Sequence, residues 1–271
     1  MNKLGVSGST IMSEREKFND LFKYNLGHIE IGEFKNNADF KLFLTMLSNS
    51  LVTFGIHSPI KRGKSKYDII EHVNYPPEKA IDQIDKEAKK AKNLGAKYLL
   101  VHFPFFLGTC DNDTTYLIEQ GLEKLSTIQE KHKIDIVCEP KLGDNRSPWG
   151  IEYLHQFPID IWTKYNLKVC IDIGDYVMAV GDNKVMEYIQ KWNDFIKVVH
   201  LHNVDYLDDD YFWKPVHPDD ESDNHHKIEH IISYLSKLDN IYFVLEHTPH
   251  GGHSMEYIQT GCDYIRKAIF K

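Results

Sequence analysis

The sequence predicts a single (β/α)8 TIM barrel, an α/β fold that residues 1–271 form as one domain. The prediction rests on short apolar segments that alternate with longer amphipathic ones, and on a length that suits one barrel. The apolar segments are rich in Val, Ile and Leu, as buried parallel strands are. They lie at 3–8, 27–32, 51–57, 97–102, 134–139, 167–173, 196–202 and 241–246. An open doubly wound sheet is the alternative, but no GxGxxG motif follows any of these segments.

The segments between these strands carry helix signals. Ser13 and Glu16 have the spacing of a capping box, which predicts a helix that runs to about Tyr24. Pro77 suits the first turn of the helix expected before the fourth strand, and Gly95 suits its carboxyl-terminal cap. Further helices are expected at 114–131, 151–165 with an interruption at Pro158, 183–192, 226–238 and 254–269.

The composition is that of a globular domain without membrane helices. Hydrophobic residues make up 42% and charged residues 27%, which suits a globular domain and excludes a disordered chain. No apolar run reaches the ~18 residues of a membrane helix, and the first residues lack the apolar core of a signal peptide. None of the four cysteines belongs to a CxxC pair, so we expect reduced thiols in a cytoplasmic protein without membrane contact. A net charge of −8 shows no overall basic footprint for nucleic acid.

Histidines and carboxylates stand at or near the ends of six consecutive predicted strands, the third to the eighth. They are His57, His102, Glu139, Asp172, His200, His202 and Glu246, and Glu30 and Glu33 lie near the end of the second strand. Active sites of such barrels lie at the carboxyl ends of the strands, and neighbouring strands are ~4.8 Å apart. Any one of these residues alone is more often a helix cap or a satisfied polar group. The whole set, however, predicts a divalent metal site of one to three ions, with Zn²⁺, Mn²⁺, Fe²⁺ or Co²⁺ as the metals that suit mixed His and carboxylate ligands.

The order of these residues resembles the xylose isomerase-like TIM-barrel superfamily, which includes sugar phosphate isomerases and epimerases and endonuclease IV-like proteins. The resemblance covers nearly the whole chain. It implies a metal quartet formed by Glu139 in VCEP, Asp172 in CIDIGD, His200 in VVHLHN and Glu246 in VLEHT.

Other positions are similar to the endonuclease IV branch in particular. The resemblance implies further metal ligands at His57 in GIHSP, His102 in LLVHFP, and Asp223 and His225 in ESDNHH. Asp175 stands in DIGDYVMAVG where that branch has a histidine, and a carboxylate there can still bind a metal.

Several residues are candidates for substrate contacts. Lys141 and Arg146 follow the fifth strand and are the candidate cationic contacts, and His202 lies beside the expected metal ligands. Gly251 and Gly252 precede the last predicted helix, where backbone amides can hold a phosphate. A plain solvated loop and a plain βα turn are the alternatives at these positions.

The segment 203–223 holds eight acidic residues against Lys214 alone, a formal charge of −7. Such a run usually forms a solvated loop. Its aromatic residues, however, predict a lid over the mouth of the barrel. These are Tyr206, Tyr211, Phe212 and Trp213.

Three functions are compatible with these residues. The favoured one is a metal-dependent isomerase or epimerase of a small sugar or sugar phosphate, in which Glu139 and Glu246 pass a proton as base and acid. The alternative is an endonuclease IV-like phosphoester hydrolase acting on abasic-site DNA, which His57 and His102 favour. A barrel that only binds a metal or a sugar is the third, and the intact pair of glutamates argues against it. The acidic segment and the net charge favour a small carbohydrate over DNA as the partner, and the sequence leaves the oligomeric state open.

Overall fold

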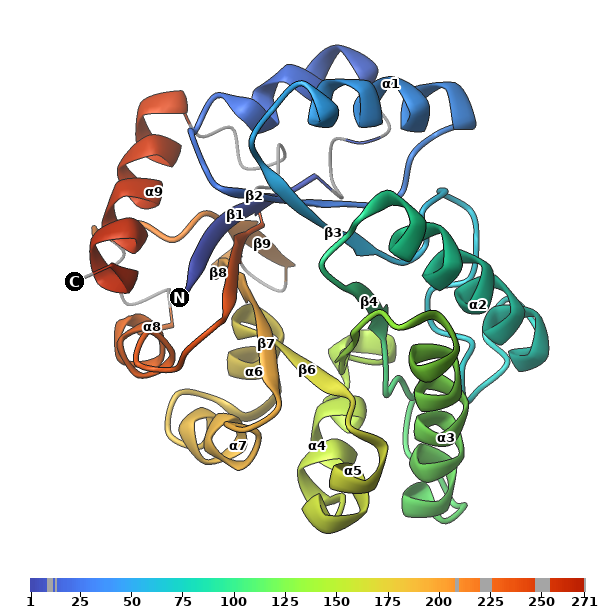
Figure 1. The fold of residues 1–271 in the computed structure, drawn as a ribbon. Helices are drawn as coiled ribbons and strands as arrows, with labels where there is room; N and C mark the ends of the chain where they lie inside the picture. The colour runs from blue at the N-terminus through green and yellow to red at the C-terminus, as the bar shows by residue number, and fades with distance from the viewer. Residues whose placement is uncertain (9–11, 13, 208–209, 220–225, 247–253, 271) are drawn as a thin grey trace.

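The computed structural model is a closed barrel of eight parallel strands, as predicted, and it describes residues 1–8, 12, 14–207, 210–219, 226–246 and 254–270. Figure 1 looks along the barrel, with the helices arranged around it. The order around the barrel is β1-β10-β7-β6-β5-β4-β3-β2. The strands are β1 (Lys3–Ser7), β2 (His28–Ile31), β3 (Thr53–His57), β4 (Leu99–His102), β5 (Ile136–Glu139), β6 (Lys168–Asp172), β7 (Ile196–Leu201) and β10 (Tyr242–Leu245).

The helices between the strands mostly follow the predicted segments. The α-helices are α1 (Asn37–Ser48), α2 (Pro77–Leu94), α3 (Thr114–His132), α4 (Trp149–Gln156), α5 (Ile159–Tyr165), α6 (Ile173–Val180), α7 (Val185–Lys191), α8 (Glu229–Leu235) and α9 (Met255–Ile269). Gly95 caps α2 with a positive φ of 80°, a conformation that glycine adopts without strain. Pro158 separates α4 from α5, as expected, because it cannot supply a backbone N–H to continue α4.

The helix expected at 13–24 and two of the α-helices differ from the prediction. The expected 13–24 helix is a 3-10 helix over Arg15–Phe22, and Ser13 of the expected capping box lies outside the described residues. The helices α1 and α6 were not predicted. Asn36 caps α1 by accepting a hydrogen bond from the amide of Asp39, and α6 follows β6 without a loop. The apolar sequence of α6 reads equally well as a continuation of a buried strand, so periodicity alone does not separate the two.

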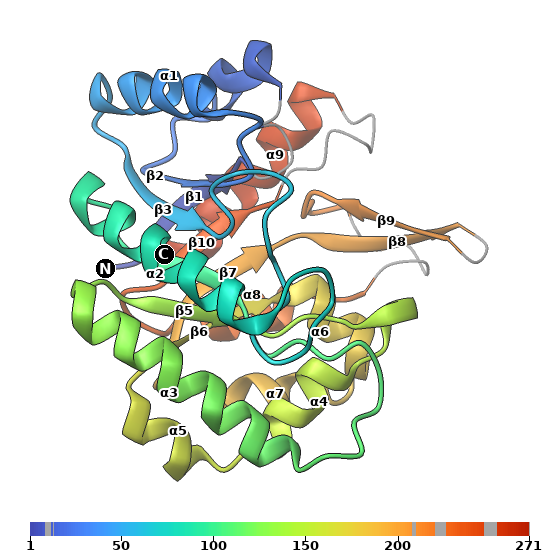
Figure 2. The same ribbon diagram turned by 90° about the vertical axis from the view of Figure 1, so that its right-hand side faces the viewer.

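The segment after β7 forms an antiparallel hairpin of β8 (Asn203–Leu207) and β9 (Asp210–Lys214). Figure 2 shows this hairpin projecting from one end of the barrel, while the amino terminus lies at the other end. The acidic segment is therefore an ordered β-ribbon over much of its length rather than an irregular loop. No helix in the described ranges is long and apolar enough to cross a membrane.

Side chains fill the barrel in two ways. A large apolar core lies between the strands and the helices, and a smaller apolar cluster lies inside the barrel. The inner cluster consists of Tyr98, Leu100, Val137, Cys170, Val198 and Val244. Gly55 makes room for the Tyr98 ring, because a Cβ atom at Gly55 would lie 2.2 Å from Cζ of that ring. Polar side chains occupy the rest of the interior, and they include the fully buried His28, Glu30, Asp172, His200 and His202.

Candidate metal centre

The ends of β3, β4 and β5 bring two imidazoles and a carboxylate together. In the parallel register His102 pairs with Glu139 of the neighbouring strand. The Nε2 atoms of His57 and His102 are 3.1 Å apart, and Oε2 of Glu139 lies 3.4 and 3.2 Å from them. Nδ1 of His57 lies 2.9 Å from the carbonyl oxygen of Ser58, to which it can donate, and this leaves the Nε2 lone pair facing the group.

This group fits a divalent cation. Oε2 of Glu139 is buried and has no hydrogen-bond partner in the described part of the chain. Burial lowers the pKa of His102 to about 3, so its imidazole is neutral and can offer a lone pair. Three electron-rich atoms that converge on one point need a proton or a cation between them. Burial alone would lower the pKa of His57, but the neighbouring carboxylates of Glu139 and Glu30 raise it, and a metal ion can take the place of that proton. His57, His102 and Glu139 are therefore a chemically suitable set of ligands.

A second group lies around His200, whose strand pairs it with Asp172. Nδ1 of His200 is 3.1 Å from Oε1 of Glu139 and 3.4 Å from Oε1 of Glu246. His202 bonds Oδ1 of Asp172 through Nε2 at 2.7 Å, and the same nitrogen is 4.0 Å from Oε2 of Glu246. The four residues of the expected quartet thus meet in one network of contacts at the barrel mouth.

Lys141 links the two groups. Its Nζ lies 3.3 Å from Oε1 of Glu139, 3.0 Å from Oδ2 of Asp172 and 2.5 Å from Oδ2 of Asp175. Burial alone would lower the pKa of Lys141, but the surrounding carboxylates raise it well above its usual value. Burial and the charge of Asp172 raise the pKa of Asp175 to about 7. In this structure the expected substrate contact Lys141 therefore neutralises the candidate ligands themselves.

The hairpin covers one side of the mouth. The ring centroid of Trp213 lies 3.8 Å from that of His202, and the Arg146 guanidinium lies 3.7 Å from the ring centroid of Tyr211. The Trp213 ring is also 5.8 Å from Nζ of Lys141. On the opposite side Tyr67 stacks on His102 with ring centroids 5.1 Å apart. These contacts give the mouth aromatic walls, while Tyr206 and Phe212 of the expected lid are exposed.

Some expected site residues lie outside the described part of the chain, and one residue that the sequence places near a strand end, Glu30, was given no role in the site. Asp223, His225, Gly251 and Gly252 lie outside the described residues. Glu30 is fully buried, and its Oε1 lies 3.0 Å from Nε2 of His200. Its position near a strand end was visible in the sequence, but a lone acid in an apolar strand gives no sign of its partner.

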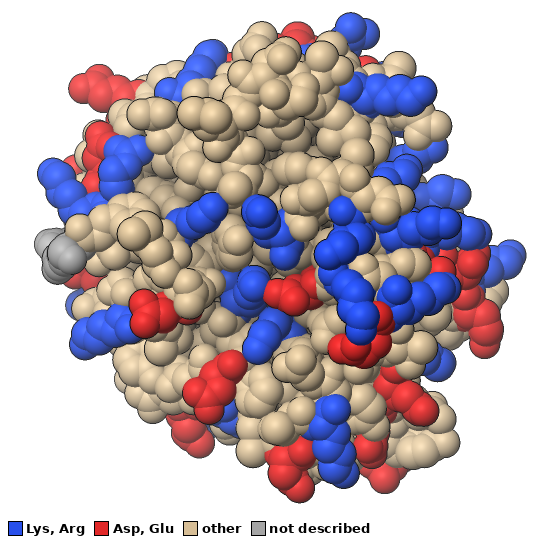
Figure 3. Space-filling view, viewed as in Figure 1, with Lys and Arg blue, Asp and Glu red and all other residues tan. Residues whose placement is uncertain are grey.

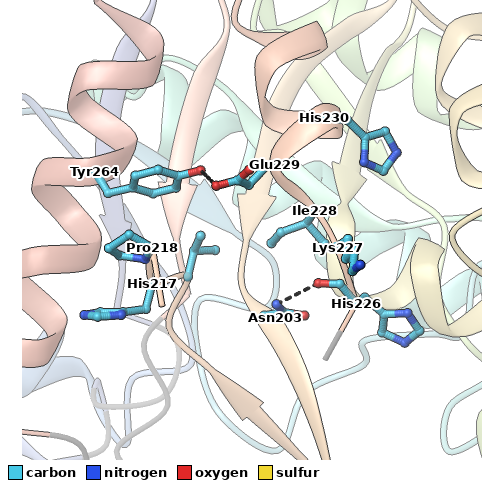
Figure 4. A pocket seen from close by; sticks show the side chains of 10 residues that line it. Asn203, His217, Pro218, His226, Lys227, Ile228, Glu229, His230 and Tyr264 are labelled. Carbon is cyan, nitrogen blue, oxygen red and sulfur yellow. Dashed lines mark hydrogen bonds between the residues drawn. The ribbon is translucent and has the colours of Figure 1, made fainter. Parts of the chain in front are cut away.

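A separate cavity of about 430 Å³ lies beside the base of the hairpin (Figure 4). Its lining residues are Asn203, Val216, His217, Pro218, His226, Lys227, Ile228, Glu229, His230 and Tyr264. None of the candidate ligands that the structure describes lines it. His226 bonds Tyr206 and Asp182, so its ring is already engaged in protein contacts.

Comparison with known proteins identifies the family. The xylose isomerase-like TIM barrel family matches residues 76–268. A solved structure of a D-tagatose 3-epimerase-like protein is 17% identical with a TM-score of 0.69, and the match covers 99% of this chain and 97% of that chain. An AP endonuclease, family 2, from Brucella melitensis is 17% identical with a TM-score of 0.64, covering 98% of this chain and 99% of that chain.

A third solved structure is a xylose isomerase-like TIM barrel protein from Mycobacterium smegmatis in complex with magnesium. It is 14% identical with a TM-score of 0.64, and the match covers 94% of this chain and 87% of that chain. Among curated proteins, nothing matches the chain. The structural likenesses agree on the fold, and the family match spans most of the barrel. The chain belongs to the xylose isomerase-like TIM barrel family.

Proposed function

We propose that this protein is a divalent-metal-dependent isomerase or epimerase that acts on a small sugar or sugar phosphate. The observation that carries the proposal is the pair of glutamates at the mouth, since Glu139 and Glu246 both reach Nδ1 of His200. Two carboxylates that meet beside one imidazole nitrogen can take a proton from a substrate carbon and return it at another position. The structural likeness to a D-tagatose 3-epimerase-like protein supports this proposal.

The candidate metal ligands are Glu139, Asp172, His200 and Glu246, joined by His57, His102 and Asp175. A divalent cation held there would orient two substrate oxygens and acidify the adjacent C–H bond. Asp223 and His225 remain proposed ligands from the sequence alone, as Gly251 and Gly252 remain proposed phosphate contacts. Zn²⁺, Mn²⁺, Fe²⁺ and Co²⁺ suit the ligand set, and the magnesium-containing relative adds Mg²⁺ to the metals worth testing.

The side chains around the ligands suit a small polar substrate. Lys141 donates from a buried position and can hold a substrate oxygen once a metal neutralises the carboxylates. Trp213 packs on His202 and limits the access of water to Asp172. Arg146 is held against Tyr211 at the edge of the hairpin, where one phosphate of a sugar phosphate could reach it.

An endonuclease IV-like hydrolase is the second candidate, and the group of His57, His102 and Glu139 favours it. Several DNA phosphates would then have to approach the acidic segment 203–223, whose formal charge is −7 from eight acids and one lysine. Two like charges ~8 Å apart repel by about 2 kcal/mol at an effective dielectric near 20, before salt screening. Figure 3 shows lysine and arginine side chains gathered toward α2 and α3 on the face seen in Figure 1, from which the strands start rather than end.

The test compares two activities of the metal-loaded protein. One arm measures interconversion across a panel of ketoses and ketose phosphates, and the other measures incision of an abasic-site duplex at low and moderate salt. We expect turnover of a sugar that Glu246→Gln lowers at least 100-fold, because a general acid or base contributes ~10²–10⁴-fold. Glu152→Gln on α4 is the matched control, since Glu152 bonds Tyr188 away from the mouth. Salt-sensitive incision without sugar turnover would replace the proposal with the hydrolase.

A further inference from the structure

Glu30 is a buried carboxylate in the middle of the barrel with two hydrogen-bond donors. Its Oε1 lies 3.0 Å from Nε2 of His200, and its Oε2 accepts from the Tyr98 hydroxyl at 2.8 Å. All three side chains are fully buried. An ionised carboxylate in such a place is costly unless charge-assisted hydrogen bonds stabilise it. The two donors therefore fix the carboxylate, and the carboxylate in turn fixes the donors.

A chain of hydrogen bonds supports Glu30 from the far end of the barrel. Nζ of Lys3 lies 3.3 Å from Oγ1 of Thr53, which lies 3.0 Å from Nδ1 of His28. Nε2 of His28 lies 3.1 Å from the Tyr98 hydroxyl. Because Tyr98 gives its only proton to Glu30, it must accept from Nε2–H of His28. This leaves Nδ1 of His28 unprotonated beside the Thr53 hydroxyl, which donates to the carbonyl oxygen of Gly27 at 3.0 Å. The donors of His28 and Tyr98 both point toward Glu30, an arrangement in which successive hydrogen bonds strengthen one another.

These hydrogen bonds fix the orientation of the His200 ring. Since Nε2–H of His200 is directed to Glu30, its Nδ1 is the atom that faces Oε1 of Glu139 and Oε1 of Glu246. A half-turn of the ring would replace Nε2–H by a carbon at this position, and Glu30 would lose its hydrogen bond from His200. Carboxylates that accept from the second nitrogen of a ligand histidine orient the ring and make the ligating nitrogen a better donor to metal.

We propose that Glu30 is a positioning residue that holds His200 with Nδ1 directed at the metal centre, and that Tyr98 holds Glu30 in place. This inference rests on the proposed metal site. In this proposal Glu30 contacts neither the metal nor the substrate. The buried hydrogen-bonded side chains of His28, Tyr98 and Glu30 act at the mouth only by orienting His200. The alternative is that Glu30 is itself a metal ligand, together with His200 and Glu246.

The test measures Co²⁺ binding to chelator-treated protein, with the affinity taken from the visible absorption spectrum and the number of ions from elemental analysis. We expect Glu30→Gln to weaken the affinity ~10–100-fold with the number of ions unchanged, as is typical when the partner of a ligand histidine is removed. Tyr98→Phe removes the donor to Glu30 and should weaken the affinity by a smaller factor. Tyr242→Phe is the matched control at the same end of the barrel, because Tyr242 contacts the rings of His28 and Tyr98 but not Glu30.

The outcomes separate this inference from the proposed function. Loss of one ion in Glu30→Gln would make Glu30 a ligand and overturn the inference, as would unchanged affinity in both Glu30→Gln and Tyr98→Phe. If Glu30→Gln does not fold, Tyr98→Phe alone decides. If the unaltered protein binds no Co²⁺, the metal centre itself fails. The positioning is then read by NMR, where the hydrogen-bonded Nε2 proton of His200 must be present in the unaltered protein and shift or vanish in Tyr98→Phe.

Discussion

Replacing Lys141 by methionine should destabilise the metal-free protein strongly, because the lysine ammonium group contacts three buried carboxylates at once. Nζ lies 3.0 Å from Asp172 and 3.3 Å from Glu139, and it also contacts Asp175. At an effective dielectric near 20, one pair at 3 Å attracts by roughly 5 kcal/mol. Dehydration of the ammonium group cancels part of this attraction. Removing one partner of a buried ion pair costs about 3–5 kcal/mol, which is the loss expected for Lys141→Met.

The assay is urea unfolding in the presence of a chelator, with the melting temperature as a second readout. A loss of about 3–5 kcal/mol corresponds to a melting temperature roughly 6–20 °C lower in a chain of this size. Lys86→Met is the control, since Lys86 forms an exposed pair with Asp82 on α2 and should cost at most ~1 kcal/mol. Saturating divalent metal should restore part of the lost stability, because it supplies positive charge to the same carboxylates. A loss below about 1 kcal/mol in chelator would refute this reasoning.

Three further predictions follow from the mouth of the barrel. Gly174→Ala should lower stability by about 1–3 kcal/mol and weaken metal binding. The new Cβ would lie 1.9 Å from Cε1 of His202 and displace that ring from Asp172. An unchanged urea midpoint would contradict this prediction. Burial lowers the pKa of His102 to about 3 in the folded protein, whereas the unfolded chain has the ordinary value of about 6.5. With respect to His102, the folded protein is therefore most stable above pH 6.5, where the ring is neutral in both states, and it loses stability as the pH falls from 6.5 toward 3. His102→Gln should therefore show a weaker dependence of chelator-treated stability on pH below about 6.5, and equal slopes would count against it. Trp213→Ala should raise KM for the sugar substrate with little change in melting temperature, because Trp213 packs on His202 at the mouth. Steady-state kinetics with the best substrate of the panel measures this change, and an unchanged KM would contradict the prediction.

The barrel and the strand-end residues were predictable because both follow from local patterns. Alternating apolar and amphipathic segments are repeated along the chain, and parallel strands place their carboxyl ends at one rim. The register then sets His102 beside Glu139 and Asp172 beside His200, which the order of the strands implies. For this reason the sequence alone predicts a cluster of imidazoles and carboxylates at the mouth.

The side-chain contacts that these residues make across the barrel could not be predicted from local sequence patterns. Glu30 reaches His200 from a strand that lies far away in sequence, so nothing near Glu30 signals the contact. Lys141 was expected to meet substrate, yet its position between carboxylates depends on how a side chain crosses the mouth. The hairpin β8–β9 pairs acidic segments whose composition resembles that of a solvated loop, and its strand character comes from cross-strand contacts rather than from charge.

The number of metal ions bound per chain is the most direct test of the divalent metal site proposed at the strand ends. The measurement is elemental analysis of protein purified without chelator, compared with a Glu139→Ala/Glu246→Ala variant whose folding is checked by circular dichroism. We expect at least one divalent ion per chain in the unaltered protein and its loss in the folded double variant, because Glu139 contacts both groups of candidate ligands. Full occupancy in the folded double variant, or no divalent ion in the unaltered protein, would contradict this expectation.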